Sequence, residues 1–406
     1  MTVPFFQPDV SEAEVQAVVE CLRSGWLTTG PKAKQFEAEF SQFVGAAHAV
    51  ALNSCTAALH LALDAVGLRR GELVLVPTFT FAATAEVVRY FDATPVFVDC
   101  EPTALCMDPV QTAETLRVLA AGGKLPGVPD DHAGVRAIIP VHYAGQMVEV
   151  DAFRALADEH EVSLIEDAAH TLPAYYRSSD SAPWRPAGST ADITCFSFYA
   201  NKCITTGEGG MAVTNREDYA ERMRIMSLHG MSRDAWKRFT AAGSWYYEIV
   251  APGFKYNLTD IAAAIGLCQL ARANELWQGR RGVAARLSEA LADIDEVELP
   301  RELPNRQHAW HLFPIRLRLE KLRIDRAQFI EELKARGIGA SVHWLPLHMQ
   351  PYYRETYGYR PEQFPNAAAA WPRMVSLPIF PSMTTAQTDE VAQAVRAIVG
   401  EHRART

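Results

Sequence analysis

The sequence predicts an α/β fold, with a mostly parallel β-sheet flanked by helices and a smaller α+β domain after it. Short apolar strands alternate with helices from about residue 47 to about residue 226, which is typical of a parallel sheet covered on both faces. The chain has 406 residues, 49% of them hydrophobic, which is enough for two domains. Polar residues follow several predicted strands, and ligands of parallel sheets bind at that edge.

The first part of the chain predicts two helices, a strand and a third helix. Ser11 caps a helix over residues 11–23, and a second helix covers residues 32–43. A strand at residues 47–52 then enters a helix near Thr56 through the small polar residues 53–55. Such a helix N-terminus presents unpaired N–H groups and a positive dipole, so it predicts an anion-binding turn. An ordinary capped helix is the alternative.

The middle of the chain repeats the alternation of strand and helix. Polar residues stand at three of the predicted strand ends, namely residues 78–81, residues 142–143 and residues 166–170. Two stretches rich in Gly, Pro, Ser or Asp, residues 120–134 and 177–189, are expected to be surface excursions with little bearing on chemistry. The predicted strands are residues 73–76, 95–98, 137–141, 163–165 and 210–214, and the predicted helices are residues 81–90, 151–160 and 216–226.

The rest of the chain predicts a long helix and a small domain. A region without clear periodicity, up to Glu248, is expected to be a loop that covers a site or a neighbouring subunit. The long helix covers residues 261–292, and a strand (312–319), a helix (326–336), a strand (340–343) and a helix from residue 386 follow. We therefore divide the chain into an N-terminal segment (1–30), a large domain (31–260) and the connecting helix with the small domain (261–406).

Composition excludes several classes of partner. The formal net charge is -9 and no basic run occurs, which argues against nucleic acid or an anionic membrane as the main partner. No basic leader with an apolar run and no apolar segment of roughly 18 residues is found, so a cytoplasmic protein is expected. The seven cysteines are odd in number and include no CxxC pair, which indicates neither a disulfide framework nor a metal site.

One stretch, residues 196–210, combines a lysine with an aromatic strand and a glycine-rich turn. Phe196 and Phe198 alternate with Ser197 as on a half-buried strand, and Lys202 follows shortly after the end of this strand. A lysine amine titrates near 10.4 in water, so a lysine that performs covalent chemistry must be desolvated or paired to lower its pKa. The alternative is an exposed lysine in a flexible loop.

A lysine, a carboxylate at a strand end and a helix N-terminus together predict pyridoxal 5'-phosphate (PLP) as cofactor. The amine binds the cofactor covalently, the carboxylate keeps its pyridine nitrogen protonated, and the helix N-terminus with a hydroxyl holds its phosphate. Each part alone is a weak signal. Their joint presence in one chain is specific to this cofactor.

These residues also resemble a known family. Residues 26–31, 56–60, 166–170, 202–210 with Ser197, and 256–261 resemble the nucleotide-sugar aminotransferases of the DegT/DnrJ/StrS family. The resemblance covers nearly the whole chain and implies the fold-type-I architecture of PLP-dependent transferases. Within the family, residues 140–145 and 308–313 are most similar to the enzymes that make UDP-4-amino-4-deoxy-L-arabinose.

The resemblance implies a role for each cofactor-binding residue. Lys202 would be the catalytic residue, which binds the cofactor covalently and moves the proton between the two reacting carbons. Asp167 would pair with the pyridine nitrogen, and His170 would lie beside the ring hydroxyl. Phe81 would stack on the ring face. The phosphate would be held by Thr56, Ala57 and Ser197, and by Asn257 of the neighbouring subunit, which implies a homodimer with shared active sites.

Six further residues are candidate substrate contacts, with structural roles as the alternative for each. They are Thr28, Thr29, Tyr143, His229, His308 and His343. The chain departs from the family at Cys55, where many relatives carry glycine or alanine. A positive φ required there would cost about 1 kcal/mol or more.

The predicted reaction transfers an amino group from L-glutamate to C4 of a nucleotide-linked keto sugar. The alternatives within the family are amination at C3 and sugar dehydration. Some relatives replace the lysine with histidine and become dehydratases, so Lys202 favours transamination. A non-catalytic ligand sensor is a further alternative, and the lack of a basic helical domain before the fold argues against it.

Overall fold

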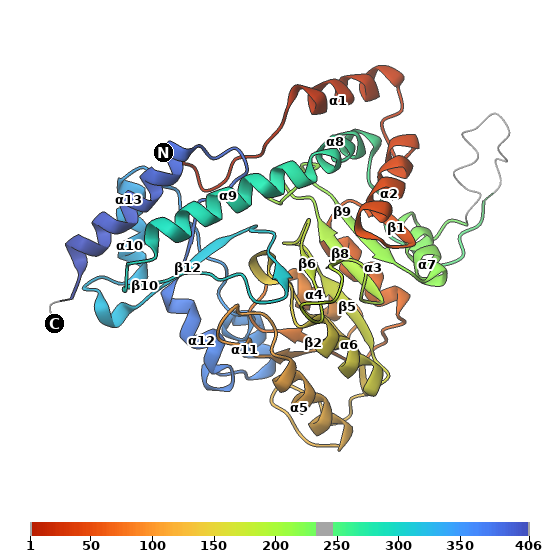
Figure 1. The fold of residues 1–406 in the computed structure, drawn as a ribbon. Helices are drawn as coiled ribbons and strands as arrows, with labels where there is room; N and C mark the ends of the chain where they lie inside the picture. Colours follow the sequence, from red (N-terminus) through yellow and green to blue (C-terminus); the bar gives the residue numbers. More distant parts are fainter. Residues whose placement is uncertain (1, 233–246, 405–406) are drawn as a thin grey trace.

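A seven-stranded sheet forms the centre of the molecule in the computed structural model, which describes residues 2–232 and 247–404 (Figure 1). The strand order is β1-β9-β8-β5-β4-β2-β3, and β9 runs antiparallel to both of its neighbours while the other adjacent pairs are parallel. The strands are β1 (His48–Leu52), β2 (Leu73–Pro77), β3 (Thr94–Val98), β4 (Val135–Ile138), β5 (Ser163–Asp167), β8 (Ile193–Ser197) and β9 (Gly210–Thr214).

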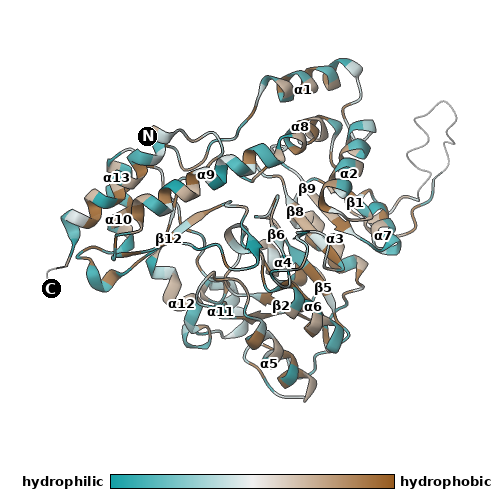
Figure 2. Cartoon of the chain, viewed as in Figure 1, coloured by the Kyte–Doolittle hydropathy of each residue, from teal (hydrophilic) through white to brown (hydrophobic). Residues whose placement is uncertain are grey.

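Helices cover this sheet because most residues of its strands are apolar and buried. All five residues of β2 and of β3 are buried, as expected for parallel strands with both faces covered, and Figure 2 shows the strands as hydrophobic. Helix α3 packs between α4 and α7 and against the sheet, while α5 contacts α6. These helices are α2 (Pro31–Val44), α3 (Cys55–Ala65), α4 (Ala83–Arg89), α5 (Pro109–Ala120), α6 (Val150–Glu159) and α7 (Glu217–Ser227). The predicted α/β fold is thus confirmed.

A second hydrophobic core lies in the C-terminal part of the chain, beside a three-stranded antiparallel sheet. This sheet consists of β10 (Val297–Glu298), β12 (Phe313–Leu317) and β13 (Met374–Leu377). Helices α9 (Ala273–Leu291), α10 (Arg326–Ala335) and α13 (Thr385–His402) pack around it. Two shorter helices, α11 (Pro351–Tyr357) and α12 (Pro365–Ala370), add residues to the first core instead. The division of the chain at residues 30 and 260 therefore stays a prediction.

The remaining elements lie at the edges. Helix α1 (Glu12–Ser24) is capped by Ser11, as predicted, and this residue forms a capping box with Glu14. The helix packs against α8 (Asp260–Ala271). Short strands β6 (Tyr175–Tyr176), β7 (Arg185–Pro186) and β11 (Arg306–Gln307) form a small sheet, so one predicted surface excursion contributes a strand. Among the helices that the structure describes, none is both long and apolar enough to cross a membrane. The predicted loop before Glu248 lies mostly outside the described residues.

Two sequence predictions are wrong. The single helix over residues 261–292 is two helices, α8 (Asp260–Ala271) and α9 (Ala273–Leu291), which meet at Arg272. The Arg272 side chain bonds Asp9 at 2.7 Å and Glu275 at 3.1 Å, contacts that a sequence pattern does not reveal. Residues 340–343 form no strand, because only Ser341 pairs with Ser376 before the chain turns away.

Candidate active site

Lys202 lies in the loop between β8 and β9, where its amide donates a hydrogen bond to the carbonyl of Tyr199 at 2.9 Å. Burial lowers the pKa of the Lys202 amine, although Cys55 and the carboxylate of Asp167 oppose part of this shift. A lower pKa leaves more of the amine neutral, which is the form that attacks a carbonyl. Lys202 is half-buried, which does not fit the alternative of an exposed surface lysine.

Asp167 ends β5 and is buried. The Thr84 hydroxyl donates to its Oδ2 at 2.8 Å, and the amide of Ala169 donates to its Oδ1 at 3.1 Å. Burial raises the pKa of Asp167, while these hydrogen bonds and the charge of Lys202 favour the carboxylate. Thr80 shares a 2.9 Å hydrogen bond with Thr84. Thr84 of α4 therefore holds the Asp167 carboxylate in place. Thr84 was not among the residues predicted from the sequence, because its contact with Asp167 joins two segments 83 residues apart.

The N-terminus of α3 forms an anion-binding turn. The Ser54 hydroxyl accepts the amide of Ala57 at 3.0 Å, and the Ser54 carbonyl accepts the amide of Ala58 at 3.1 Å. The two preceding amides, of Cys55 and Thr56, have no carbonyl one turn earlier in the helix and remain for a ligand. Cys55 opens α3 and has no positive φ, so the predicted strain at this position is absent.

Ser197 lies beside this turn. It pairs with Gly210 across β8 and β9, and a Cβ atom on Gly210 would lie 2.4 Å from the backbone of Ser54. The strand pair and the first turn of α3 are therefore in close contact. A residue with a hydroxyl therefore lies close to the N-terminal amides of a helix, and hydroxyl and amide donors suit a phosphate.

Gly210→Ala should open this turn, because its Cβ would overlap the backbone of Ser54. We expect weaker PLP binding, with the dissociation constant raised by at least about tenfold if the shift costs one backbone hydrogen bond, roughly 1.4 kcal/mol. The matched control is Gly282→Ala, where a Cβ meets nothing within 4 Å and the helix gains from alanine. Fluorescence titration with PLP measures both variants. Equal affinities would contradict the close contact.

His170 lies near Lys202 in a cluster of rings. Its Nδ1 accepts the amide of Ala144 at 3.2 Å, so a neutral ring carries its proton on Nε2. Trp344 stacks on His170 with centroids 5.1 Å apart and lies 6.0 Å from Phe81. The ring of Phe81 is exposed, with 57% of its surface accessible. An exposed aromatic ring beside buried polar groups fits a stacked cofactor. Trp344 was missed, and its position beside His343 was the only signal.

Buried histidines continue this cluster. The ring of His311 lies 4.3 Å from that of His170, and His343 shares a hydrogen bond with Ser376 at 2.9 Å. Burial lowers the pKa of His343 to about 4, with the charge of Lys202 adding to the effect, and burial lowers the pKa of His308 to about 3. These rings are therefore neutral at physiological pH.

This cluster should make the protein sensitive to acid. The unfolded chain binds protons on these histidines below about pH 6.5, whereas the folded chain does so only near its lowered pKa values. Stability is therefore complete above pH 6.5 and is lost as the pH falls toward 4. His308→Gln should lose less stability between pH 7 and pH 5 than the parent, as measured by urea unfolding. An equal loss of stability in His308→Gln and in the parent would contradict the lowered pKa of the buried His308 ring.

Two of the predicted substrate contacts support other residues. Tyr143 is buried, and its hydroxyl donates to the carbonyl of His343 at 3.1 Å. The Nδ1 of His308 accepts the amide of Trp310 at 2.7 Å, beneath a stacked Trp310 ring. Neither side chain is exposed, so their contacts hold the segments that carry His343 and His311.

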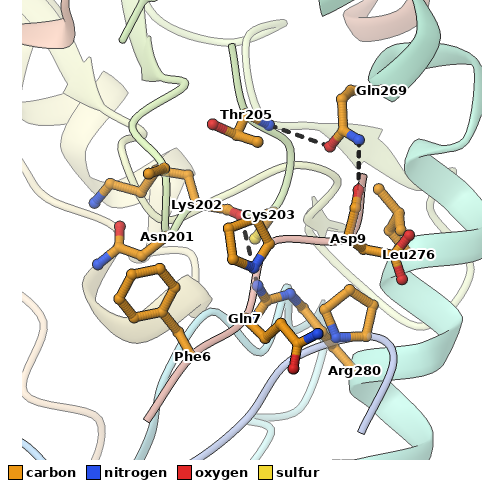
Figure 3. Close-up of a pocket in the computed structure, with 13 residues that line it drawn as sticks. Phe6, Gln7, Asp9, Asn201, Lys202, Cys203, Thr205, Gln269, Leu276 and Arg280 are labelled. Carbon is orange, nitrogen blue, oxygen red and sulfur yellow. Dashed lines mark hydrogen bonds between the residues drawn. The ribbon is translucent and has the colours of Figure 1, made fainter. Parts of the chain in front are cut away.

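Four other predicted residues lie on the surface. The Thr29 hydroxyl donates to the carbonyl of Leu258 at 2.5 Å and accepts the side chain of Asn257 at 2.6 Å, so these segments lie together. Thr28 and His229 are exposed, and the described residues make no contact that brings either to Lys202. Figure 3 shows the Lys202 loop beside the N-terminal segment at Phe6 and Gln7.

Residues 8–396 match the DegT/DnrJ/EryC1/StrS aminotransferase family. The chain belongs to this family. It is 42% identical over 400 residues to the spore coat polysaccharide biosynthesis protein SpsC of Bacillus subtilis, which covers 98% of this chain and 97% of SpsC. The sugar aminotransferase Spr1654 of Streptococcus pneumoniae in its PMP form has a TM-score of 0.87 at 30% identity, covering 98% and 99% of the two chains. Helicobacter pylori PseC has a TM-score of 0.86 at 26% identity, covering 98% and 99%.

These similarities confirm the fold-type-I architecture and the cofactor. The protein is a PLP-dependent sugar aminotransferase, and structures of Spr1654 exist with PLP and with PMP. The donor set described above fits this cofactor. The α3 turn and Ser197 suit a phosphate, Asp167 suits a pyridine nitrogen, and the amine of Lys202 suits an aldehyde.

Proposed function

We propose that this enzyme transfers the amino group of L-glutamate to C4 of a nucleotide-linked 4-keto sugar. PLP supplies the electron sink and carries the amino group between the two substrates. The chain supplies the groups that bind, orient and move protons around it.

We assign each role to the residues already described. Lys202 binds the cofactor covalently and, once released, holds and returns the transferred proton through its amine. Asp167 keeps the ring nitrogen protonated, His170 orients the ring hydroxyl through Nε2, and Phe81 covers the ring face. Thr56, Ala57 and Ser197 hold the phosphate, together with Asn257 of a second copy.

The observation that carries the proposal is a groove beside the cofactor site. It has a volume of about 610 Å³ and contains Phe81 and Trp344, the aromatic residues that border the cofactor site. Its other lining residues include Glu86, Arg89, Tyr90 and Tyr352. A volume of this size suits a ligand larger than a free sugar, and aromatic faces with one guanidinium suit a base and a phosphate.

The relatives support a sugar as the substrate, and two sequence motifs support amination at C4. SpsC is described as acting in spore coat polysaccharide biosynthesis and PseC in pseudoaminic acid biosynthesis, so related chains serve the synthesis of unusual sugars. Residues 140–145 and 308–313 resemble enzymes that aminate C4. Both motifs contact His170, since the Ala144 amide donates to its Nδ1 at 3.2 Å and the ring of His311 lies 4.3 Å from its ring. Cytoplasmic location stays a prediction.

The test is product analysis with matched keto sugars. Purified enzyme receives L-glutamate and either a 4-keto or a 3-keto nucleotide sugar. We expect one equivalent of 2-oxoglutarate per 4-amino sugar formed, and no product from the unlinked keto sugar. Amination only at C3, or loss of a hydroxyl without nitrogen transfer, would favour the alternatives within the family. No turnover with any sugar would favour a ligand sensor.

We also propose that two copies share each active site. His229 lies beside the exposed apolar residues Ile249 and Val250, since the Val250 amide donates to the carbonyl of Gly230 at 2.8 Å, and this surface suits a second copy. Mixing Lys202→Ala with Asn257→Asp subunits tests this. If the sites are shared, heterodimers contain one intact site, and random mixing restores about a quarter of the parent activity. No restoration, with heterodimers shown by mass spectrometry, would contradict shared sites.

A further inference from the structure

Arg280 on α9 is a buried arginine that bonds only backbone carbonyls within the described residues. Its side chain is 3% exposed. Nη1 donates to the carbonyl of Ile379 at 3.1 Å and to those of Trp310 and His311 at 3.4 Å each. Nη2 donates to the carbonyl of Lys202 at 3.5 Å. One guanidinium thus joins three segments that are far apart in the sequence.

This arrangement is unusual for a buried charge. No described carboxylate pairs with Arg280, its Nε has no partner among the described residues, and burial lowers the pKa of the guanidinium. A buried charge without an ion-pair partner is costly, so it marks a position with a specific task. Arg286 on the same helix shows the ordinary alternative, an ion pair with Asp389 at the surface.

Two of the four carbonyls belong to the active-site region. Lys202 carries the reactive amine, and the ring of His311 lies 4.3 Å from that of His170. In Figure 3 a hydrogen bond joins Arg280 to the Lys202 backbone, and the Lys202 side chain extends away from it. Arg280 therefore touches the loop behind the amine and does not face the amine itself.

We propose that Arg280 is a positioning residue, which fixes the Lys202 backbone relative to the segment that carries His311 and thereby aims the amine at the cofactor. A planar fork of donors can hold several carbonyls at once, whereas a lysine ammonium at this position would hold fewer of them. The inference rests on the assignment of Lys202 in the proposed function.

The test compares three variants of the holoenzyme. Arg280→Lys keeps the positive charge and loses the planar set of guanidinium N–H donors. Arg280→Ala leaves a space for added guanidinium ion. Arg286→Gln is the matched control on the same helix. We expect Arg280→Lys to lower kcat by about 10- to 100-fold, as a misplaced catalytic group does, with KM for the donor nearly unchanged. Millimolar guanidinium should partly restore Arg280→Ala, and Arg286→Gln should match the parent.

A second readout does not depend on turnover. In the cofactor-free protein, an amine-selective reagent followed by peptide mapping gives the labelling rate of Lys202, which should change in Arg280→Lys and remain unchanged in Arg286→Gln. Parental kcat and labelling in Arg280→Lys, even with a lower melting temperature, would overturn the proposal. If borohydride fixes the cofactor to another lysine in the parent, the assignment of Lys202 fails instead, which separates the two proposals.

Discussion

Replacing Lys202 with alanine should abolish transamination. The variant loses both the covalent bond to PLP and the amine that moves the proton, and proton transfer alone contributes about 10²- to 10⁴-fold. We therefore expect kcat to fall by more than about 10³-fold. The visible absorption band of the lysine-bound cofactor should disappear, while PLP still binds through its phosphate and ring nitrogen.

The control for this variant is Lys334→Ala, which removes an exposed lysine of α10. It should keep both the absorption band and the rate. Single-turnover measurements with L-glutamate distinguish the chemical step from binding. Donor turnover that persists in Lys202→Ala would assign the chemistry to another amine.

Asp167→Asn should lower the activity of the enzyme without lowering its stability. An amide cannot keep the pyridine nitrogen protonated, so kcat should fall by about 10²- to 10⁴-fold, the usual contribution of a positioned acid or base. Burial raises the pKa of Asp167, which means that the folded state disfavours the carboxylate at neutral pH. The cofactor-free variant should therefore be at least as stable as the parent in thermal unfolding.

Glu166→Gln is the matched control, one residue earlier on the same strand. Thr190 donates to the Glu166 carboxylate at 2.9 Å and Thr194 at 3.1 Å, and His142 lies 3.4 Å away. Although burial opposes it, these contacts lower the pKa of Glu166, so the folded state favours this carboxylate. Glu166→Gln should lower stability and leave the cofactor spectrum unchanged. A loss of stability in Asp167→Asn without a loss of rate would contradict the assignment.

The sequence predicted the residues that follow strands directly. Asp167 and Ser197 are the last residues of β5 and β8, and Lys202 lies in the loop that follows β8. Apolar runs define these strands, and the topology of a parallel sheet brings such ends to one edge. Thr56 was found for a similar reason, since a strand enters a helix there. Local pattern was sufficient for these positions.

Other parts of the site depend on contacts between distant segments. Trp344 stacks on His170 although 174 residues separate them in the chain, and residues 340–343 before it do not form the predicted strand. Arg280 lies in a helix that the sequence predicted, but its carbonyl partners come from three other segments. Tyr143 was predicted to contact the substrate, and its side chain is buried with its hydroxyl bonded to the carbonyl of His343. Propensity and periodicity carry no information about such packing.

A crystal structure of the PLP-bound enzyme would test the site most directly. We expect the Lys202 nitrogen bonded to the cofactor, an Asp167 oxygen within hydrogen-bond distance of the ring nitrogen, and the phosphate at the Cys55 and Thr56 amides with Ser197. A phosphate bound elsewhere, or a ring nitrogen that faces a residue other than Asp167, would show that these groups do not act together.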